Sequence, residues 1–365
     1  MNRKRIAILT NFVSPYRVPM FIGLAETFDT VVAVGKREPT HLEWQSPESI
    51  LKSNGVGLHQ AKGWLIRMGE DRSLHINPGY LTFLFREKPD GVISGEMGFR
   101  TLCAAIYCRL RRTPLWIWSE CTPHSERNIG RMKKLIRRRL VRTTARWISF
   151  GNACTEYLLT LGVARDSIVQ IQNGVDESAF QPDGDHEAFT GPRPLLLVVG
   201  RLVKQKGLDA LIESVQRLQS HGHVFSLRFI GAGPRGEHLE QLANQLGLKN
   251  VEFRGSMPPE DLPTQYRTAD VMIFPTLQDV WGMVVSESVL CGTPVVCSKY
   301  AGCASDIVPP EDVFDPLVPD EFDRALLRAV TGEVCPPASS RVWTMARIVG
   351  ELTHDLESVL GPPAR

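Results

Sequence analysis

Two carboxylates and two cations in the second half of the chain have the types and spacing needed to hold a ligand. Asp279 and Glu287 lie before and after a predicted helix start, within the stretch Pro275–Val296 (PTLQDVWGMVVSESVLCGTPVV). Arg201 and Lys206 lie in a separate loop that glycines flank. Carboxylates accept hydrogen bonds from hydroxyl groups, whereas cations and the unpaired amides of a helix N-terminus bind phosphate. These residues therefore predict a ligand with both phosphate and hydroxyl groups.

Both loops lie between a predicted strand and a predicted helix. The apolar runs 195–199 and 271–274 have the length and composition of buried strands, and helical patterns follow at 208–219 and from Met283. Short strands that alternate with helices predict a parallel sheet with helices on both faces. Such sheets bind their ligands at the carboxyl ends of the strands, which is where both loops lie.

A third loop, Gly231-Ala-Gly233-Pro234, follows the predicted strand 226–230. Gly236 completes the spacing of a dinucleotide-binding turn, but Pro234 intervenes and no acidic residue follows at the distance expected for a ribose contact. A nicotinamide cofactor is therefore not expected.

The first half repeats the alternation of strands and helices. Strands are predicted at 5–10, 30–34, 91–94, 114–118 and 147–150. The loops at their carboxyl ends hold the candidate residues of the first domain, which are Ser14, Tyr16, Arg17, Glu96, Glu120 and His124.

A chain of 365 residues suits two domains better than one core. The predicted division is a first domain at 1–180, a linker at 181–194, a second domain at 195–335, and a helical segment at 336–365 that packs back on the first domain. The linker is rich in Pro, Gly and Asp. Its Asp183-Gly-Asp185 is therefore interpreted as a solvated turn rather than as a metal-binding pair.

The composition is that of a globular protein, with 43% apolar and 22% charged residues. No apolar run approaches the ~18 residues of a membrane-spanning helix. The basic start is followed by only four apolar residues, Ile6–Leu9, which predicts a first strand rather than a signal peptide. The eight cysteines form no C-x-x-C pair, so we expect reduced thiols and a cytoplasmic protein without a zinc site or disulfide framework.

The charge is unevenly distributed along the chain. Through Asn173 there are 26 Lys and Arg against 14 Asp and Glu, a balance of +12, and after it 16 against 26, a balance of −10. The predicted helix Arg131–Arg146 is basic and amphipathic. It could rest on an anionic membrane surface, or it could pack on its own sheet with a solvated basic face. No aromatic residues interleave with the basic ones, so nucleic acid is not an expected partner.

An ordered set of short motifs runs through the second half. It comprises Asn173-Gly-Val-Asp176, Gly200-Arg201…Lys206-Gly207, Gly231-Ala-Gly-Pro234, Asp279-Val-Trp-Gly282…Glu287 and Cys291-Gly-Thr-Pro-Val295. In this order and spacing the set resembles the retaining, nucleotide-sugar-dependent glycosyltransferases of family 4, from about Arg146 onward and more weakly before it. The resemblance implies the GT-B fold, an α/β fold of two Rossmann-like parallel-sheet domains that face a cleft, with a C-terminal helix.

The resemblance also implies roles for individual residues. Arg201 and Lys206 would bind the donor diphosphate and help it depart, Glu287 would bind the ribose, and Asp279 would contact the sugar. The rest of the donor site would be Gly200, Gly231, Gly233, Trp281, Gly282, Met283 and Val284. The acceptor would bind the first domain, where the acceptor-side residues are Ser14, Tyr16, Arg17, Glu96 and His124. No metal ion and no cofactor are implied, because the cations replace a metal and the nucleotide sugar is the co-substrate.

The chain departs from the family pattern at two places. Asp279 stands where the family usually has Glu, so its carboxylate reaches less far by one methylene. A His is common near the donor sugar at the end of the fifth strand of the first domain. Glu120 falls at about that place and His124 lies four residues on, and Glu120 is the preferred catalytic candidate.

These features predict a metal-independent glycosyltransferase of the hexosyltransferase type. It would move a sugar from a nucleotide diphosphate donor to a hydroxyl of a saccharide or lipid-linked saccharide, in cell-surface polysaccharide or glycolipid biosynthesis. It would be cytoplasmic and peripheral at the inner face of the cell membrane. The alternative is a non-catalytic sugar-nucleotide-binding subunit. A sugar-nucleotide epimerase is less favoured, because the sequence offers no acid/base constellation for proton abstraction.

Overall fold

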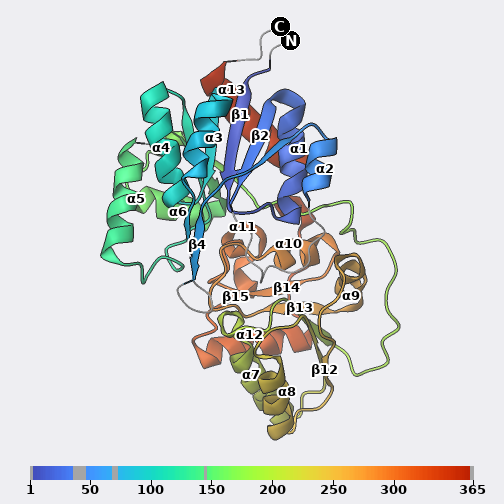
Figure 1. The fold of residues 1–365 in the computed structure, drawn as a ribbon. Coiled ribbons are helices and arrows are strands. Elements are labelled where there is room, and N and C mark those ends of the chain that lie inside the picture. The colour runs from blue at the N-terminus through green and yellow to red at the C-terminus, as the bar shows by residue number, and fades with distance from the viewer. Residues whose placement is uncertain (1–2, 36–46, 68–72, 144–145, 362–365) are drawn as a thin grey trace. The chain divides into compact units, whose positions relative to one another are not determined.

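The chain forms two α/β units, each built around its own parallel sheet (Figure 1). A computed structural model describes residues 3–35, 47–67, 73–143 and 146–361. Unit 1 takes in the described residues up to Phe150, Cys154–Gly174 and those from Thr344, and unit 2 takes in Gly151–Ala153 and Val175–Trp343. Two parallel-sheet α/β domains were predicted from the sequence, and that prediction is confirmed.

Unit 1 contains a seven-stranded parallel sheet in the order β3-β2-β1-β6-β7-β8-β9. Its strands are β1 (Arg5–Thr10), β2 (Asp29–Val34), β3 (Gly57–Gln60), β6 (Gly91–Gly95), β7 (Leu115–Ser119), β8 (Arg146–Phe150) and β9 (Ile168–Ile171), beside a hairpin of β4 (Trp64–Arg67) and β5 (Ser73–Ile76). Its helices are η1 (Pro15–Arg17), α1 (Val18–Thr27), α2 (Glu48–Ser53), α3 (Gly79–Glu87), α4 (Phe99–Arg111), α5 (Arg131–Thr143), α6 (Gly151–Thr160), η2 (Arg165–Ser167) and α13 (Met345–Leu360).

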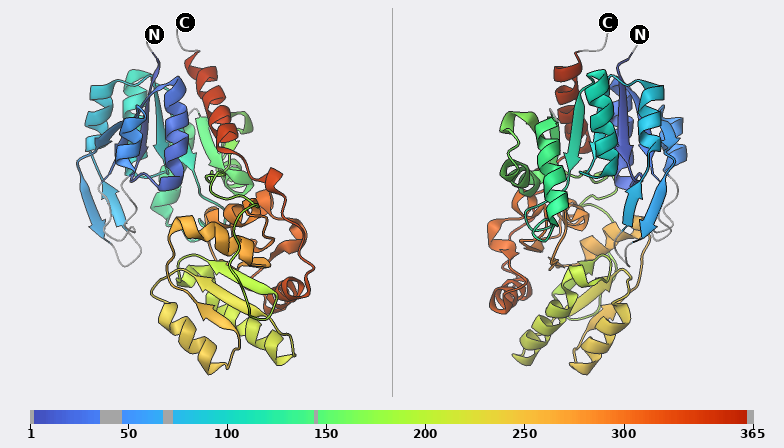
Figure 2. Two further views of the ribbon diagram at one scale, coloured as in Figure 1. Left: turned by 90° about the vertical axis from the view of Figure 1, so that its right-hand side faces the viewer. Right: turned by 60° about the vertical axis from the view of Figure 1, so that its left-hand side comes forward.

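Helix α13 joins unit 1 from the far end of the chain and packs against α1 and β9 (Figure 2). Asp355 on this helix accepts a hydrogen bond of 2.7 Å from Trp116 Nε1 and pairs with Arg146. The helix begins after Thr344, whose side chain accepts a hydrogen bond from the amide of Arg347. A buried Trp and a charge pair thus attach the C-terminal segment to the sheet of unit 1.

Unit 2 contains a six-stranded parallel sheet in the order β12-β11-β10-β13-β14-β15. Its strands are β10 (Leu195–Val199), β11 (Ser226–Ile230), β12 (Val251–Phe253), β13 (Val271–Phe274), β14 (Val295–Ser298) and β15 (Val313–Phe314). Its helices are η3 (Lys204–Lys206), α7 (Leu208–Ser220), α8 (Gly236–Gln245), η4 (Pro259–Asp261), α9 (Leu262–Thr268), α10 (Met283–Leu290), α11 (Ala304–Ile307), η5 (Pro310–Asp312), α12 (Pro319–Thr331) and η6 (Ser339–Arg341).

Strand β10 shows why the central strands β10 and β13 are apolar throughout. Successive side chains of a strand point to opposite faces of the sheet. Leu195, Leu197 and Val199 belong to one hydrophobic core, and Leu196 and Val198 belong to the core on the other face. Because helices cover both faces of a parallel sheet, neither set of side chains meets water.

The structure differs from the sequence-based boundaries at three places. The helix predicted over Arg131–Arg146 ends at Thr143, and Arg146 begins strand β8. Within the helical segment predicted at 336–365, the final helix starts only at Met345, after the capping Thr344. Residues 181–194, predicted as a linker, lie within unit 2. Within the described ranges, every helix is too short or too polar to span a membrane.

A charge network holds the segment 181–194 on unit 2. The carboxylate of Glu187 accepts hydrogen bonds from Arg254 at 2.5 and 2.7 Å, from Gln265 at 2.8 Å and from Arg228 at 3.2 Å. Arg228 is almost fully buried. The hydrogen bonds from Arg254, followed by those of Gln265 and the charge of Arg228, lower the pKa of Glu187 to about 2 despite its partial burial.

Replacing Glu187 by Gln is expected to lower the free energy of unfolding at pH 7 by about 1–3 kcal/mol, because the buried positive charge of Arg228 then loses one of its negatively charged partners. The depressed pKa makes this stabilisation fully present above about pH 4.5, and it is lost as pH falls toward about 2. Urea denaturation at pH 7 and pH 3 measures both effects. Glu240→Gln on the exposed face of α8 is the matched control, and an equal effect there would contradict the assignment.

Candidate functional site

The Arg201–Lys206 loop is fixed by its contact with the loop after β13. Gly207 has a left-handed conformation, with φ of 67°, and a Cβ there would collide with the carbonyl oxygen of Pro275. The carbonyl of Gln205 accepts hydrogen bonds from the Leu277 amide at 2.7 Å and from Thr276 Oγ1 at 3.0 Å. The predicted diphosphate-binding loop and the start of the acidic loop are therefore one rigid assembly.

The glycines of the turn after β11 are required by packing on this same assembly. A Cβ on Gly231, whose φ is 134°, would collide with the Gly200 carbonyl, and one on Gly233 would collide with Leu202. The Gly200 amide donates to Ile230 O at 2.9 Å. These contacts explain both glycines without a ligand, so their direct contact with a donor stays a prediction.

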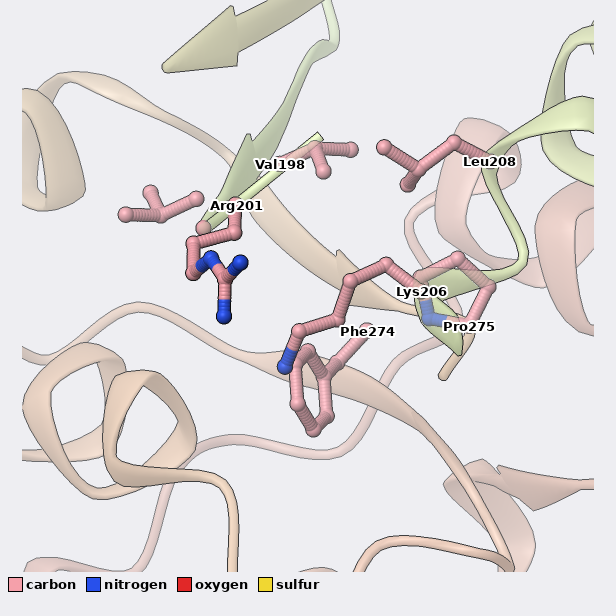
Figure 3. A pocket seen from close by; sticks show the side chains of 8 residues that line it. Val198, Arg201, Lys206, Leu208, Phe274 and Pro275 are labelled. Carbon is pink, nitrogen blue, oxygen red and sulfur yellow. The ribbon is translucent and has the colours of Figure 1, made fainter. Parts of the chain in front are cut away.

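A small pocket, partly open to solvent, lies at the carboxyl end of β10. Its lining is mostly apolar and consists of Val198, Val199, Gly200, Arg201, Lys206, Leu208, Phe274 and Pro275. Figure 3 shows the charged ends of Arg201 and Lys206 extending toward the same space. The guanidinium of Arg201 is exposed and makes no hydrogen bond or ion pair with any described residue. A cation without a partner beside an apolar wall is suited to an anionic ligand.

Lys206 already has a counter-ion in this state. Its Nζ atom lies 2.5 Å from Oδ2 of Asp279 and 5.0 Å from the centre of the Phe274 ring. The other carboxylate oxygen of Asp279 accepts the amide of Trp281 at 3.1 Å. The two side chains are 22% and 19% exposed, so their attraction is only partly screened. The structure thus brings together two predicted site residues that lie 73 positions apart in the sequence.

The chain enters α10 through a tight turn. Gly282 has φ of 104°, and a Cβ there would stand 2.8 Å from the Phe274 ring. The amides of Met283 and Val284 follow in the first turn of the helix, where amides have no intrahelical partner. Trp281 was predicted to contact the donor, but its side chain is only 1% exposed and packs in the core of unit 2. The Trp281 side chain therefore shapes the turn. It has no exposed surface with which to make the predicted contact with the donor.

Glu287 lies one turn further along α10. Its Oε2 atom accepts a hydrogen bond of 2.7 Å from the hydroxyl of Tyr266. Burial raises the pKa of Glu287, and the hydrogen bond from Tyr266 opposes that rise. The other oxygen, Oε1, accepts no hydrogen bond from the described residues and is available to a ligand.

In unit 1 the predicted acceptor residue Arg17 is enclosed instead of exposed. Its guanidinium lies 4.4 Å from the centre of the Trp118 ring and 4.5 Å from that of Phe150. It forms an ion pair with Glu120 and donates to Asn173 Oδ1 at 3.2 Å. Burial lowers the pKa of Arg17. Glu120, the predicted catalytic residue, is therefore the counter-ion of a buried cation, and its catalytic role stays a prediction.

The remaining acceptor-side candidates differ in exposure. Glu96 directly follows β6 in a left-handed conformation with φ of 59°, its side chain 64% exposed and 3.1 Å from Arg100. Ser14 is buried, with its carbonyl accepting the Arg17 amide, and Tyr16 is half-buried. His124 belongs to a tight turn in which its carbonyl accepts from Arg127. Of these candidates, Glu96 presents the most accessible charge.

Sequence reasoning did not assign three residues that support the site. Phe274 ends β13 and lies under Lys206, Tyr266 holds Glu287, and Asn173 holds Arg17. Phe274 and Tyr266 read as core residues in the sequence, and Asn173 reads as part of an Asn-Gly turn. Only their distances in space reveal the contacts.

Comparison with known proteins agrees with this architecture. The Anabaena protein HepE, solved in complex with UDP and glucose, superposes with a TM-score of 0.72 over 98% of this chain and 100% of that chain, at 16% identity. This likeness confirms the GT-B fold predicted from the sequence. The chain is thus a protein of the GT-B class.

A likeness to a known family lies in the second unit. Residues 183–342 match the model described as "Glycosyl transferases group 1", and that segment contains all four charged residues of the predicted donor site. The likeness to the group 1 glycosyltransferases therefore holds for this segment, which is less than half of the chain. The narrower assignment to family 4 stays a prediction.

Curated relatives match over part of their length. A GDP-mannose-dependent alpha-(1-6)-phosphatidylinositol monomannoside mannosyltransferase of Mycolicibacterium smegmatis is 33% identical over 175 residues, 44% of this chain and 44% of that protein. A D-inositol 3-phosphate glycosyltransferase of Corynebacterium aurimucosum is 30% identical over 152 residues, 38% of this chain and 36% of that protein. The chain thus spans less than half the length of these relatives.

Proposed function

We propose that the protein is a retaining, metal-independent glycosyltransferase of the hexosyltransferase type. It moves a sugar from a nucleoside diphosphate donor to a hydroxyl of a saccharide or lipid-linked saccharide, in cell-surface polysaccharide or glycolipid biosynthesis. The observation that carries the proposal is the pair of cations, Arg201 and Lys206, at one apolar-walled pocket within the group 1 domain.

The cations stabilise the charge that develops on the departing diphosphate. When the bond between the sugar and the diphosphate breaks, negative charge builds up on the phosphate oxygens. Arg201 has no competing partner in the described chain, so its guanidinium binds these oxygens without breaking an existing ion pair. Their positive charge does the work that a metal ion does in other transferases.

The ion pair between Lys206 and Asp279 gives the site a donor-free and a donor-bound state. In the donor-free state Asp279 neutralises Lys206 at 2.5 Å. A diphosphate carries more negative charge than one carboxylate, so it draws the ammonium group away from Asp279. The freed Asp279 oxygen then accepts a hydrogen bond from a sugar hydroxyl, the role that the sequence predicts for it.

A thermal-shift panel of nucleotide sugars tests donor binding. A ligand present at about 100 times its Kd adds about 2.7 kcal/mol to the stability of the folded state. We expect a UDP- or GDP-linked sugar to raise Tm and NAD to leave it unchanged. Transfer or donor hydrolysis by the purified protein then separates an enzyme from a non-catalytic sugar-nucleotide-binding subunit. A panel without any shift, together with no transfer, would refute the proposal.

We further propose that α5 rests on an anionic membrane surface, at the cytoplasmic face of the membrane. Its inner side is anchored by the buried Leu140 and by Arg137, which pairs with Glu126. Its outer side exposes Met132 and Leu135, 77% and 67% exposed, among basic residues and without an acidic one. Apolar side chains within a basic surface fit lipid tails and anionic headgroups together.

Sedimentation with phosphatidylglycerol vesicles tests this surface. The protein is expected to bind these vesicles and to release them at high salt, and phosphatidylcholine vesicles are expected to leave it in solution. The double variant Met132→Glu/Leu135→Glu removes the apolar contact and lowers binding, while the same change at the exposed Leu246 of unit 2 serves as the control. Equal binding by both variants would contradict the α5 assignment.

A further inference from the structure

The proposed ribose-binding carboxylate has a buried tyrosine as its partner. Tyr266 lies on α9, its side chain has no exposed surface, and its hydroxyl donates to Glu287 Oε2 at 2.7 Å. This is the one hydrogen bond that the Glu287 carboxylate makes within the described part of the chain. The direction of the carboxylate therefore depends on Tyr266.

The tyrosine itself is held from two sides. Its backbone carbonyl accepts a hydrogen bond of 2.6 Å from Thr293 Oγ1, in the turn that ends α10. Its ring packs edge-on against Phe180, with ring centres 6.1 Å apart. The Thr293 amide in turn donates to Ser288 O at 3.0 Å. These contacts fix the phenol relative to α10, so its hydroxyl offers the carboxylate a single direction.

Holding one oxygen of a carboxylate determines where the other one points. With Oε2 bound to Tyr266, rotation about the last bond of the Glu287 side chain would break a hydrogen bond to a charged group. Oε1 is therefore presented in one orientation, without a competing partner in the described residues. A partly buried carboxylate without such a partner samples several orientations and loses part of its affinity for hydroxyl groups.

We propose that Tyr266 is the positioning residue for ribose recognition: it orients Glu287 so that the free oxygen accepts the ribose hydroxyls of the donor nucleotide. The inference rests on the proposed function, because it takes Glu287 to be the ribose-binding residue. It adds that Tyr266 on α9 and Glu287 on α10 together discriminate between ribose and a sugar without these hydroxyls. Tyr266 itself does not touch the ligand.

Calorimetric titration with UDP, GDP and their 2′,3′-dideoxy forms tests the inference. The dideoxy nucleotides keep the base and the diphosphate but lack the hydroxyls that Glu287 binds. Tyr266→Phe removes one hydroxyl group and keeps the ring on Phe180. We expect this variant to bind the ribonucleotide about tenfold more weakly and the dideoxy form as the unmodified protein does. Tyr157→Phe, which removes a hydroxyl bonded to Glu126 in unit 1, is expected to change neither affinity.

The possible outcomes test the role of Tyr266 separately from the proposed function. A Tyr266→Phe variant that weakens both forms equally would show a structural role only, and one that weakens neither would show that Glu287 orients itself. Either result overturns the inference and leaves the proposed function standing. If the unmodified protein binds neither UDP nor GDP, the proposed function fails, and the role of Tyr266 fails with it. The inference is supported if both Glu287→Gln and Tyr266→Phe lose the preference for the ribonucleotide over its dideoxy form.

Discussion

Lys206→Ala and Arg201→Ala are each expected to lower the rate of sugar transfer by about 10²–10³-fold, and together to abolish it. Both variants remove a cation that stabilises the departing diphosphate, so the loss falls on kcat as well as on donor affinity. The measurement is steady-state transfer with the donor that the thermal-shift panel identifies. The fold should survive, because neither side chain belongs to a hydrophobic core.

The two variants should differ in stability. Arg201 makes no contact with a described residue through its charged group, so its removal is expected to change the free energy of unfolding by no more than about 0.5 kcal/mol. Removing Lys206 leaves Asp279 without its counter-ion and is expected to cost about 1 kcal/mol. Lys204→Ala is the matched control, since this exposed lysine of the same loop makes no ion pair within the described chain. Full activity of both Arg201→Ala and Lys206→Ala would show that the diphosphate binds elsewhere.

The central strands of both sheets could be predicted from the sequence because they are buried on both faces. Runs such as Leu195–Val199 and Val271–Phe274 are apolar at every position, and water reaches neither face. The loops at their carboxyl ends then follow from the topology of a parallel sheet. The candidate positions Arg201, Lys206 and Asp279 were therefore identified without any knowledge of distances.

Pairings between distant residues could not be predicted in the same way. Lys206 and Asp279 were expected to meet different parts of a ligand, and the structure shows them bonded to each other. Gly231 was interpreted as a ligand contact, whereas its lack of a side chain is required by the Gly200 carbonyl. A glycine is needed where the backbone packs closely against another backbone segment, and it is needed equally where the backbone packs closely against a ligand. The residue type alone does not tell these two situations apart. Only the folded structure separates the two causes.

The end of α5 illustrates a local limit of the same kind. Arg146 continues the basic pattern of the helix, so periodicity alone extends the helix to this residue. In the structure Arg146 is the first residue of β8, and its side chain pairs with Asp355, more than two hundred positions away. Arg146 pairs with Trp116 of β7 in the sheet and with Asp355 through its side chain, and helical periodicity carries no information about such long-range contacts.

Arg17→Ala is expected to lower the free energy of unfolding of unit 1 by about 3–5 kcal/mol. The change empties the space beside the Trp118 and Phe150 rings and leaves Glu120 without its cation. Arg17→Met fills most of that space with an apolar chain, so it isolates the loss of charge. Urea denaturation of the full chain, followed by tryptophan fluorescence, measures the effect, and the transition of unit 2 in the same experiment is the internal control.

The double variant Arg17→Met/Glu120→Gln decides what Glu120 contributes. If the two residues act as a pair, the double variant is more stable than the sum of the single changes predicts, with a coupling energy of about 1–3 kcal/mol. Such coupling means that Glu120 serves first to keep Arg17 charged beside two aromatic rings, which fixes the loops that follow β1 and β7. A coupling energy near zero would mean that the rings alone hold Arg17. The carboxylate of Glu120 would then be available for the catalytic role that the sequence predicts for it.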